Sequence, residues 1–241
     1  METQVSGRYN LKNMIYAMSD IHGMYDKYIK MLELIKFSDN DELYVLGDVI
    51  DRGDKSVEIL LDMMKRPNVN PIIGNHELMA LTVLDVMFKG ENGESSVPVE
   101  ALIGDWLING GGATLEGIAK LTNEQRLDVI DYLSDFTLFE TVDVGDKTFI
   151  MVHAGFDNFS REKKLSDYTV NDLVWHRPDP AFIYFMDNSI NVVVGHTPTK
   201  MINGGNSIVR RRGNIFIDCG ACQEGGRLAC LCFDTMEEFY T

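Results

Sequence analysis

The stretch of sequence that decides the fold, residues 42–64, reads ELYVLGDVIDRGDKSVEILLDMM. Its first part, Glu42–Leu46, is an apolar run typical of a buried strand, and it stops at Gly47-Asp48, a pair typical of a turn. A polar loop follows, and Ser56–Met64 then places apolar residues at helical spacing. The stretch therefore predicts a strand, a polar loop and a helix in direct succession.

The same order recurs on both sides of this stretch. Upstream, Met14–Met18 predicts a strand that ends at Ser19-Asp20, and Tyr25–Ile35 predicts a helix. Downstream, Asn70–Ile73 predicts a third strand, which stops at Gly74-Asn75. Strand, loop and helix repeated in this way are typical of an α/β fold with a parallel sheet.

The rest of the chain divides into a helical part and a strand-rich part. The middle, from Leu78 to about Leu138, is predicted to be mostly helical, with a glycine-rich interruption at Asn109–Gly112. We expect it to form a helical cap, at about residues 78–138, within a single domain that spans residues 1–241. The last third is predicted to form strands again, and Gly145-Asp146 predicts a hairpin turn between the first two. The predicted strands are Thr137–Val144, Thr148–Val152, Asn191–Val194, Ser207–Arg211, Asn214–Ile217 and Arg227–Phe233.

The composition narrows the classes of function. The chain has 241 residues, of which 45% are hydrophobic and 24% charged, as in proteins that build a core. Its net charge of −15 argues against nucleic-acid binding, because nothing would offset phosphate repulsion over a broad footprint. A small anionic substrate stays compatible with this charge, since bound metal cations invert the local field.

The sequence also indicates where the protein resides. No stretch approaches the ~20 apolar residues of a membrane span, so we expect no membrane partner. The first residues lack a basic start followed by an apolar run, which argues against a secretory signal. The four cysteines (Cys219, Cys222, Cys230 and Cys232) all lie near one end of the chain, unlike a disulfide framework. We therefore expect a cytoplasmic protein.

Polar side chains follow the predicted strands directly. In open α/β sheets ligands bind beyond the carboxyl ends of the strands, so these side chains are expected to meet at one rim. Carboxylate, amide and imidazole groups suit Mn²⁺, Fe or Zn²⁺, and six of them exceed what one tetrahedral ion needs. They fit two ions if one carboxylate bridges. The candidate metal ligands are Asp20, His22, Asp48, Asn75, His153 and His196, with Asp48 as the bridge.

Such a pair of ions suits one reaction in particular. Two ions ~3.5–4 Å apart clamp the attacking and leaving oxygens of an in-line phosphoryl displacement. His76 follows the candidate ligand Asn75, so it could protonate the leaving oxygen. Asp51 could fix the tautomer of His76. Arg52 offers a planar fork for phosphate oxygens, and Arg177 is a second candidate clamp.

Five motifs that contain most of these candidate residues together resemble the pattern of a known protein family. Ser19–Gly23 (SDIHG), Gly47–Gly53 (GDVIDRG), Gly74–Glu77 (GNHE), His153–Gly155 (HAG) and Gly195–Pro198 (GHTP) resemble the calcineurin-like metallophosphoesterase family and follow its order. Within that family the chain looks most like the bacterial and bacteriophage-type serine/threonine protein phosphatases. Trp106–Gly112 and the Trp175–Pro178 segment support this narrower resemblance.

The resemblance implies a fold, a cofactor and a set of roles. It implies an α-β-β-α sandwich and a dinuclear metal centre, usually filled with manganese. Asp20, His22 and Asp48 would form the first metal site, and Asp48 would also join the second, whose other ligands are Asn75, His153 and His196. A hydroxide bridging the metals would attack phosphorus, with His76 as general acid, Asp51 as its partner and the two arginines as clamps. Ser19 departs from the pattern, because many members have glycine there.

Several alternatives stay open at this point. The same motifs occur in diadenosine tetraphosphate hydrolases, because the metal centre recognises the phosphate group and not the group attached to it. A non-catalytic scaffold with this fold would be expected to lose ligands, and every position is intact. A phosphoprotein, phosphopeptide or small phosphorylated molecule is the expected substrate. The cysteines are expected to be buried thiols, with a structural metal as the alternative. Glu77 is expected to cap or orient locally.

Overall fold

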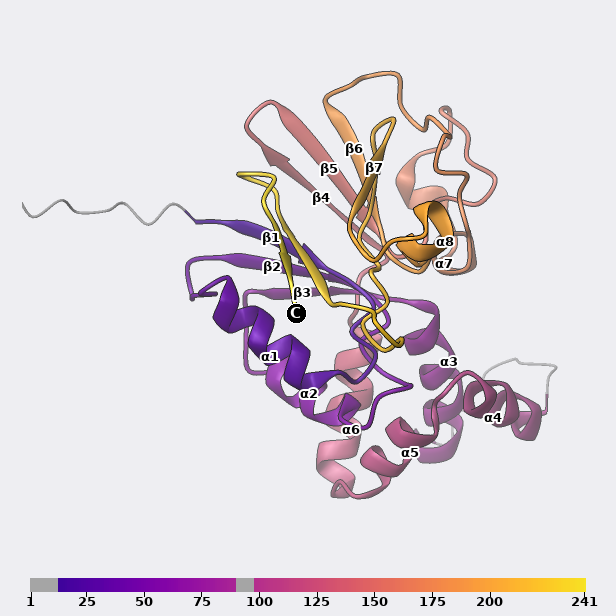
Figure 1. Ribbon diagram of the computed structural model, residues 1–241. Helices are drawn as coiled ribbons and strands as arrows, with labels where there is room; N and C mark the ends of the chain where they lie inside the picture. The colour runs from indigo at the N-terminus through magenta and orange to yellow at the C-terminus, as the bar shows by residue number, and fades with distance from the viewer. Residues whose placement is uncertain (1–12, 90–97) are drawn as a thin grey trace, which may run out of the picture.

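The computed structural model describes residues 13–89 and 98–241, and two five-stranded sheets form its centre (Figure 1). The first sheet has the order β10-β9-β1-β2-β3. In it β1, β2 and β3 run parallel, whereas β9 pairs antiparallel with β1 and the edge strand β10 pairs antiparallel with β9. Its strands are β1 (Ile15–Met18), β2 (Glu42–Leu46), β3 (Val69–Ile72), β9 (Ala229–Cys232) and β10 (Glu238–Tyr240).

The second sheet has the order β4-β5-β6-β8-β7. Strands β5, β6 and β8 are parallel, and the hairpin predicted at Gly145-Asp146 joins β4 to β5. Its strands are β4 (Phe139–Val144), β5 (Lys147–Val152), β6 (Ile190–Val194), β7 (Val209–Arg211) and β8 (Asn214–Phe216). The two sheets therefore share one feature, a set of parallel strands with their carboxyl ends side by side.

Apolar side chains fill the space between the two sheets. Ala17 and Leu46 from the first sheet belong to one buried cluster with Met151 and Val193 from the second. Phe149 stacks on Phe233 in this layer, with ring centroids 4.1 Å apart. Both faces of each sheet are buried, the inner face against the other sheet and the outer face beneath helices, which explains why the strands read as near-continuous apolar runs rather than as an alternating pattern.

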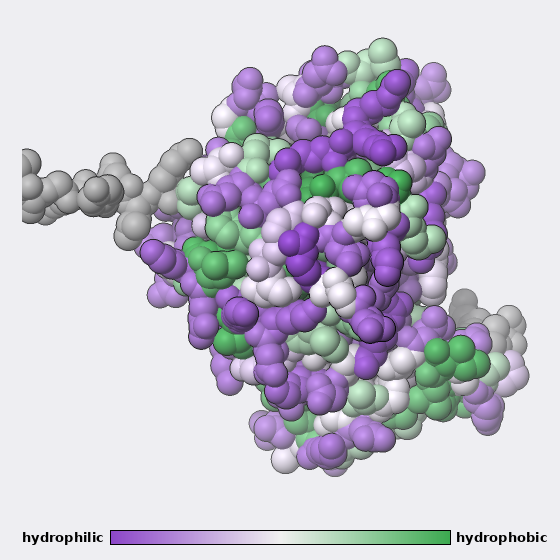
Figure 2. Space-filling model, viewed as in Figure 1, coloured by the Kyte–Doolittle hydropathy of each residue, from purple (hydrophilic) through white to green (hydrophobic). Residues whose placement is uncertain are grey.

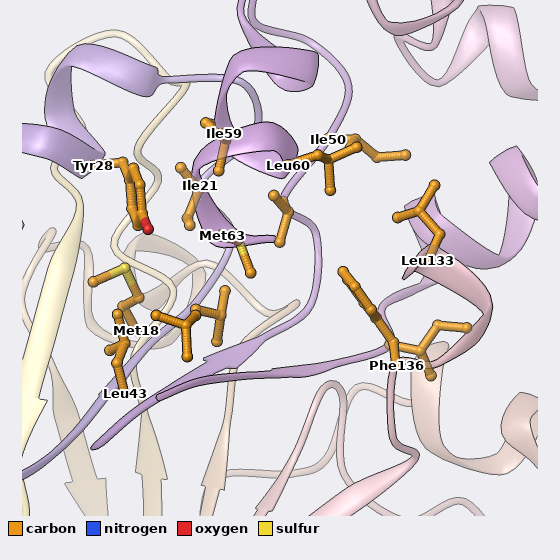
Figure 3. Close-up of a cluster of buried hydrophobic side chains, with 14 of the residues drawn as sticks. Met18, Ile21, Tyr28, Leu43, Ile50, Ile59, Leu60, Met63, Leu133 and Phe136 are labelled. Atoms are coloured by element: carbon orange, nitrogen blue, oxygen red, sulfur yellow. The ribbon is translucent and has the colours of Figure 1, made fainter. Parts of the chain in front are cut away.

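Helices cover the outer face of the first sheet. A second cluster joins Met18 and Leu43 of the sheet to Tyr28 and Leu60 of the helices above it (Figure 3). Phe136 extends this cluster toward the last helix of the group. The helices of this side are α1 (Tyr25–Leu34), α2 (Ser56–Met63), α3 (Asn75–Leu84), α4 (Val99–Ile108), α5 (Gly112–Ala119) and α6 (Asn123–Ser134), with a π-helical turn, η1 (Asp85–Lys89), after α3.

Shorter helices cover the outer face of the second sheet. They are η2 (Leu165–Asp167), α7 (Val170–Val174) and α8 (Thr199–Asn203), and Figure 1 shows α7 and α8 beside that sheet. Tyr184 packs edge-on against Phe156 in the buried cluster beneath them, with ring centroids 5.4 Å apart. The molecule is thus layered as helices, sheet, sheet and helices, which confirms the α-β-β-α sandwich that the resemblance implied.

Two details differ from the sequence-based expectation. The sheets are mixed rather than purely parallel; in the first sheet, β9 pairs antiparallel with β1 and β10 pairs antiparallel with β9. Strand β10 was not predicted at all, since its three half-buried residues form no apolar run. The helical cap was expected at residues 78–138, and α4, α5 and α6 lie within that range. Helix α3 begins earlier, at Asn75. Residues 90–97 of the expected cap lie outside the described part of the chain.

The length and hydropathy of the helices bear on membrane insertion. Among residues 13–89 and 98–241, none of the helices combines the length and the apolar character needed to cross a membrane. The face seen in Figure 2 is largely polar, with several apolar areas, one of which lies over α4 at the lower right. Leu107 and Ile108 of α4 are exposed there, Ile108 to 86%.

Candidate functional site

The carboxyl ends of five strands deliver the candidate metal ligands to one buried cluster. Asp20 and His22 follow β1, Asp48 follows β2, Asn75 follows β3, His153 follows β5 and His196 follows β6, and all six are buried. The parallel direction of these strands places their ends at a common edge, as the rule for open α/β sheets predicts. The site joins residues that are far apart in the chain. For example, the backbone N–H of His196 donates a 3.0 Å hydrogen bond to Oδ2 of Asp20, 176 positions away.

Asp48 lies at the centre of this cluster, between two groups of side chains. Its Oδ2 is 3.5 Å from His22 Nε2, and its Oδ1 is 3.4 Å from His153 Nε2. Two groups able to hold a metal ion share it: His22, Asp48 and His76 form one, and Asp48, His153 and His196 form the other. A carboxylate whose two oxygens face two separate ligand groups is suited to bridge two ions.

The remaining candidate ligands adjoin these groups. Asn75 Oδ1 lies 3.1 Å from His153 Nε2, which places it with the second group. Asp20 Oδ1 lies 4.0 Å from His22 Nε2, which places it with the first. The hydroxyl of Ser19 donates to Asp20 Oδ2, so the serine that departs from the family pattern is accommodated at the strand end.

The protonation state of the histidines suits metal binding. His22 and His153 each place Nδ1 against a carbonyl oxygen, that of Ile50 at 3.0 Å and that of Leu46 at 2.7 Å. An Nδ1–H donated to a carbonyl leaves the lone pair of Nε2 facing Asp48. Burial lowers the pKa of His22 and of His196 to about 3, so both imidazoles are neutral at pH 7, as ligands must be. The donor set therefore fits a pair of divalent cations.

Backbone strain is concentrated at the same place. Positive φ angles of non-glycine residues are uncommon and cost about 1–3 kcal/mol each when the surrounding structure imposes them. Six residues of the cluster or its loops adopt them, which points to a site whose geometry is held at a cost in stability. They are Asp20, His22, Asp48, Asp51, Arg52 and His196, with φ between 48° and 70°.

Glu77 holds the loop that carries Asp48. It is fully buried, and its carboxylate accepts backbone hydrogen bonds from Asp48 and Val49, each 2.8 Å long, and from Gly74 at 2.9 Å. Burial raises its pKa to about 7, and these N–H donors oppose the rise. This agrees with the expectation that Glu77 orients the chain locally.

His76 and Asp51 form a hydrogen-bonded pair at the edge of the metal cluster. His76 Nδ1 lies 2.7 Å from Asp51 Oδ2. Trp106 Nε1 donates a 2.8 Å hydrogen bond to that same oxygen, and Thr114 Oγ1 donates a 2.7 Å bond to Asp51 Oδ1. Burial opposes protonation of His76, but the charges of Asp48 and Asp51 outweigh it and raise its pKa. The pair is therefore suited to hold a proton at His76.

Both candidate phosphate clamps line an open cleft of about 480 Å³ over this cluster. Arg52 is exposed, and its guanidinium nitrogens lie 2.8 Å from His22 Nε2 and 3.0 Å from His76 Nε2. Arg177 is also exposed, and it donates a 3.1 Å hydrogen bond to the carbonyl oxygen of His196. Two cations on one cleft can bind the oxygens of a phosphoryl group.

The glycine-rich interruption between α4 and α5 makes room for one of these arginines. Gly110 has φ of 105°, and its carbonyl oxygen accepts a 3.0 Å hydrogen bond from the backbone N–H of Arg52. A Cβ at Gly110 would lie 2.9 Å from the Arg52 side chain, closer than side chains allow. The glycine is thus required for the close approach of α4 to the loop of Arg52.

Three further residues belong to this site that sequence reasoning missed. Asp218 follows β8 and lines the cleft, and the signal that could have found it is a buried strand that runs into an aspartate, as for Asp48. Trp106 and Thr114 bond Asp51 across 55 and 63 residues, and no local pattern reveals such contacts.

The four cysteines, for which the sequence left a structural metal site as the alternative, do not belong to the two ligand groups. All four cysteines are free; Cys219, Cys230 and Cys232 are buried in the two main clusters, and Cys222 is half-buried. The metal-binding groups found among the described residues contain no cysteine. Burial raises the pKa of Cys219 to about 12, as expected for an inert thiol.

Known proteins share this sequence and fold. The family model for calcineurin-like phosphoesterases matches residues 14–216. Serine/threonine-protein phosphatase 2 of Salmonella typhimurium is 27% identical over 171 residues, which cover 70% of each chain. The symmetrical bis(5'-nucleosyl)-tetraphosphatase of Nitrosomonas europaea is 26% identical over 151 residues, which cover 61% of this chain and 47% of that protein.

Solved structures agree on the fold. A crystal structure of a candidate diadenosine tetraphosphatase superposes with a TM-score of 0.64 at 17% identity, covering 96% of this chain and 94% of that one. A protein serine/threonine phosphatase from Saccharomyces cerevisiae superposes with a TM-score of 0.58 at 15% identity, covering 91% and 72%. With the family match over most of its length and a donor set that fits two cations, the chain belongs to the calcineurin-like phosphoesterase family, whose members are dinuclear metal-dependent hydrolases.

Proposed function

We propose that this metallophosphoesterase is a protein serine/threonine phosphatase that hydrolyses phosphomonoesters. One observation carries the proposal: two ligand groups share Asp48, and the His76–Asp51 pair and two arginines face the same cleft. That arrangement supplies every group that phosphate ester hydrolysis needs, namely cation sites, a proton donor and anion clamps.

The proposed cation sites follow the family pattern. Asp20, His22 and Asp48 would hold the first ion, and Asp48, Asn75, His153 and His196 the second. Two divalent ions, Mn²⁺ on our proposal, polarise the phosphoryl oxygens and supply the nucleophilic water when bound.

The other residues of the cleft divide the remaining tasks. Arg52 and Arg177 bind the non-bridging phosphoryl oxygens and orient the ester for in-line attack. His76 donates its proton to the leaving alkoxide oxygen, a step worth typically ~10²–10⁴-fold in rate. Asp51 stabilises the protonated imidazole and fixes its orientation, and Trp106 and Thr114 hold Asp51 in turn.

An apolar groove supports a peptide as the substrate. This groove, of about 290 Å³, is lined by Leu78, Met79 and Leu102, and it shares Asn109 and Trp175 with the cleft. A phosphorylated side chain bound in the cleft would thus place its flanking residues beside the groove. We propose a phosphoprotein or phosphopeptide substrate on this ground. The cytoplasmic location expected from the cysteine usage stays a prediction.

Hydrolysis of diadenosine tetraphosphate is the second candidate. Relatives with that activity in their names match the chain, although over a smaller share of their length than the phosphatase does. The Trp175 ring is 45% exposed at the cleft, a surface on which an adenine base could stack.

A direct comparison of substrates tests the proposal. The metal-stripped protein is supplied with Mn²⁺ and assayed on a phosphoserine peptide, on p-nitrophenyl phosphate and on diadenosine tetraphosphate. We expect Mn²⁺-dependent hydrolysis with the highest kcat/KM on the peptide. A higher kcat/KM on the dinucleotide would favour the second candidate. No hydrolysis of any substrate, together with no bound divalent ion, would leave a non-catalytic scaffold.

A further inference from the structure

The apolar groove beside the cleft contains one charged side chain, that of Asp105. Half-buried Leu78 and Met79 of α3, half-buried Leu102 of α4 and the exposed ring of Trp175 line this groove. Among the described residues that line it, Asp105 alone is charged. Asp105 is exposed, and within the described part of the chain its carboxylate has neither a hydrogen-bond donor nor an ion-pair partner. The groove therefore offers a free negative charge beside an apolar surface.

Asp105 lies about one helical turn from the edge that the groove shares with the cleft. That edge is formed by Asn109 and Trp175, which line both. Asn109 donates two hydrogen bonds to the carbonyl oxygen of Asp105, from its backbone N–H at 3.2 Å and from its side-chain Nδ2 at 2.8 Å. A helix rises about 6 Å over the four residues between these positions. Roughly two residues of an extended peptide span that length.

Charges of opposite sign thus follow one another from the cleft to the groove. Arg52 and Arg177 line the cleft, where the phosphate binds on the proposed function, and Asp105 lies in the groove. A phosphorylated serine carries a charge of about −1.5 to −2 at pH 7. The net charge of −15 disfavours the approach of such an anion. A lysine or arginine close to the phosphoserine would offset this repulsion and meet Asp105, whereas an acidic residue there would add to it.

We propose that Asp105 is a specificity-determining residue, which selects phosphopeptides with a lysine or arginine about two to four residues from the phosphoserine. This inference rests on the proposed function, because it concerns the substrate of the same cleft. The peptide first passes the edge at Asn109 and Trp175, and roughly two further residues bring it level with Asp105. The long, flexible stem of a lysine widens the range of positions that can reach the carboxylate.

A panel of phosphopeptides tests this inference through ratios measured on each enzyme. Every peptide has one phosphoserine among neutral residues, with lysine, alanine or glutamate at one position, about two to four residues before or after it. The Mn²⁺-loaded full chain is compared with Asp105→Asn, which removes the charge, and with Asp105→Lys, which reverses it. For the unaltered protein we expect kcat/KM to be about two- to fivefold higher on the best lysine peptide than on the matching alanine peptide, and lower on the glutamate peptide.

The two variants should change this order in different ways. Asp105→Asn should hydrolyse the lysine and glutamate peptides with similar kcat/KM, because the groove is then neutral. Asp105→Lys should prefer the glutamate peptide, because the attraction and the repulsion exchange places. If Asp105→Lys does not fold, Asp105→Asn still decides the matter, and hydrolysis of p-nitrophenyl phosphate reports whether each variant is folded and active.

A matched control and a change of salt complete the design. Asp146→Lys makes the same chemical change at the exposed turn between β4 and β5, far from α4 in Figure 1, and should keep the preference for lysine. In 1 M salt the Debye length falls to about 3 Å, so the preference of the unaltered protein should largely disappear.

The outcomes separate this inference from the proposed function. Hydrolysis of the phosphopeptides without a charge preference, or with the same preference in both Asp105 variants, would overturn the inference and leave the proposed function standing. An equal loss of preference in Asp146→Lys would assign the effect to net charge and would also overturn the inference. If p-nitrophenyl phosphate were hydrolysed and none of the phosphopeptides were, the proposed function and this inference would fail together.

Discussion

At the scale of single residues, Asp48 is the group on which the metal centre depends. Its two oxygens face His22 and His153, 3.5 Å and 3.4 Å away. Burial opposes its charge, but the histidines around it hold its pKa below the usual range. Asp48 is therefore ionised at neutral pH and available to two cations at once.

Substitution of Asp48 should abolish metal binding and activity together. In Asp48→Asn the shared negative charge is lost from both ligand groups, and only one side-chain oxygen is left where two faced the two groups. We expect no tight Mn²⁺ binding by calorimetry and no measurable hydrolysis of p-nitrophenyl phosphate. A variant that kept both ions and its activity would show that Asp48 does not bridge.

His76 should behave differently from the metal ligands. We expect His76→Asn to keep two Mn²⁺ ions and to lose ~10²–10⁴-fold in kcat on a phosphoserine peptide, whose alkoxide leaving group needs a proton. On p-nitrophenyl phosphate, whose leaving group needs none, the loss should be much smaller. Because His76 lies 3.8 Å from Asp48, the alternative role is that of a ligand, and loss of one Mn²⁺ ion in the variant would establish it.

At the scale of elements, α4 and α5 hold Asp51, the hydrogen-bond partner of His76, in place. Trp106 comes from α4 and Thr114 from α5, and both donate to the same buried carboxylate. The glycine-rich turn between the two helices brings them against the loop that carries Arg52. The helical cap is thus directly coupled to the catalytic groups.

Loss of the Thr114 hydroxyl should therefore reduce stability. Thr114→Val removes a buried hydrogen bond to a charged group, which contributes about 1.5–3 kcal/mol to the free energy of unfolding. Urea denaturation measures the change. Thr82→Val is the matched control, because that half-buried hydroxyl donates a hydrogen bond to the Leu78 carbonyl of its own helix, which carries no charge. An equal loss of stability in both variants would contradict the role of the Asp51 contact.

The groove between α3, α4 and α7 should contribute to peptide binding. Trp175→Ala removes a ring that belongs to both the groove and the cleft, so we expect a severalfold higher KM for a phosphopeptide and little change for p-nitrophenyl phosphate. Phe182→Ala is the control, since Phe182 is similarly exposed, at 43% against 45%, but packs against Phe159 and Tyr184 outside the cleft. Equal KM changes on both substrates would argue against a peptide groove.

At the scale of the whole molecule, the proposed metal ligands come from both sheets. Asp20, Asp48 and Asn75 come from the first sheet, and His153 and His196 come from the second. Cations bound between them would link the two halves of the sandwich and relieve the repulsion among buried carboxylates.

Divalent cations should consequently stabilise the folded protein. A ligand that binds only the folded state at 100 times its dissociation constant adds about 2.7 kcal/mol. We expect Mn²⁺ to raise Tm by several degrees in differential scanning calorimetry and a chelator to reverse the shift. Asp48→Asn should show no shift, whereas Asp146→Asn should show the full one. A Tm that did not respond to Mn²⁺ would contradict the proposed metal centre.

Much of the architecture could be predicted from local sequence. The strand at Glu42–Leu46 and the helix at Ser56–Met63 have the predicted position and type, because short apolar runs that end at Gly-Asp or Gly-Asn mark buried strands. Strand β10 could not be found in this way, since its residues form a pattern only when β9 lies beside them.

The sequence by itself determined the strand-end motifs, because each candidate ligand directly follows a short apolar run that must be buried. Only the tertiary structure decided how these side chains share Asp48 and which helices hold Asp51. The physical reason is that these contacts link residues 26 to 176 positions apart. Local propensity carries no information about such contacts, which form only when the two sheets pack together and bring the ends of their strands to one edge.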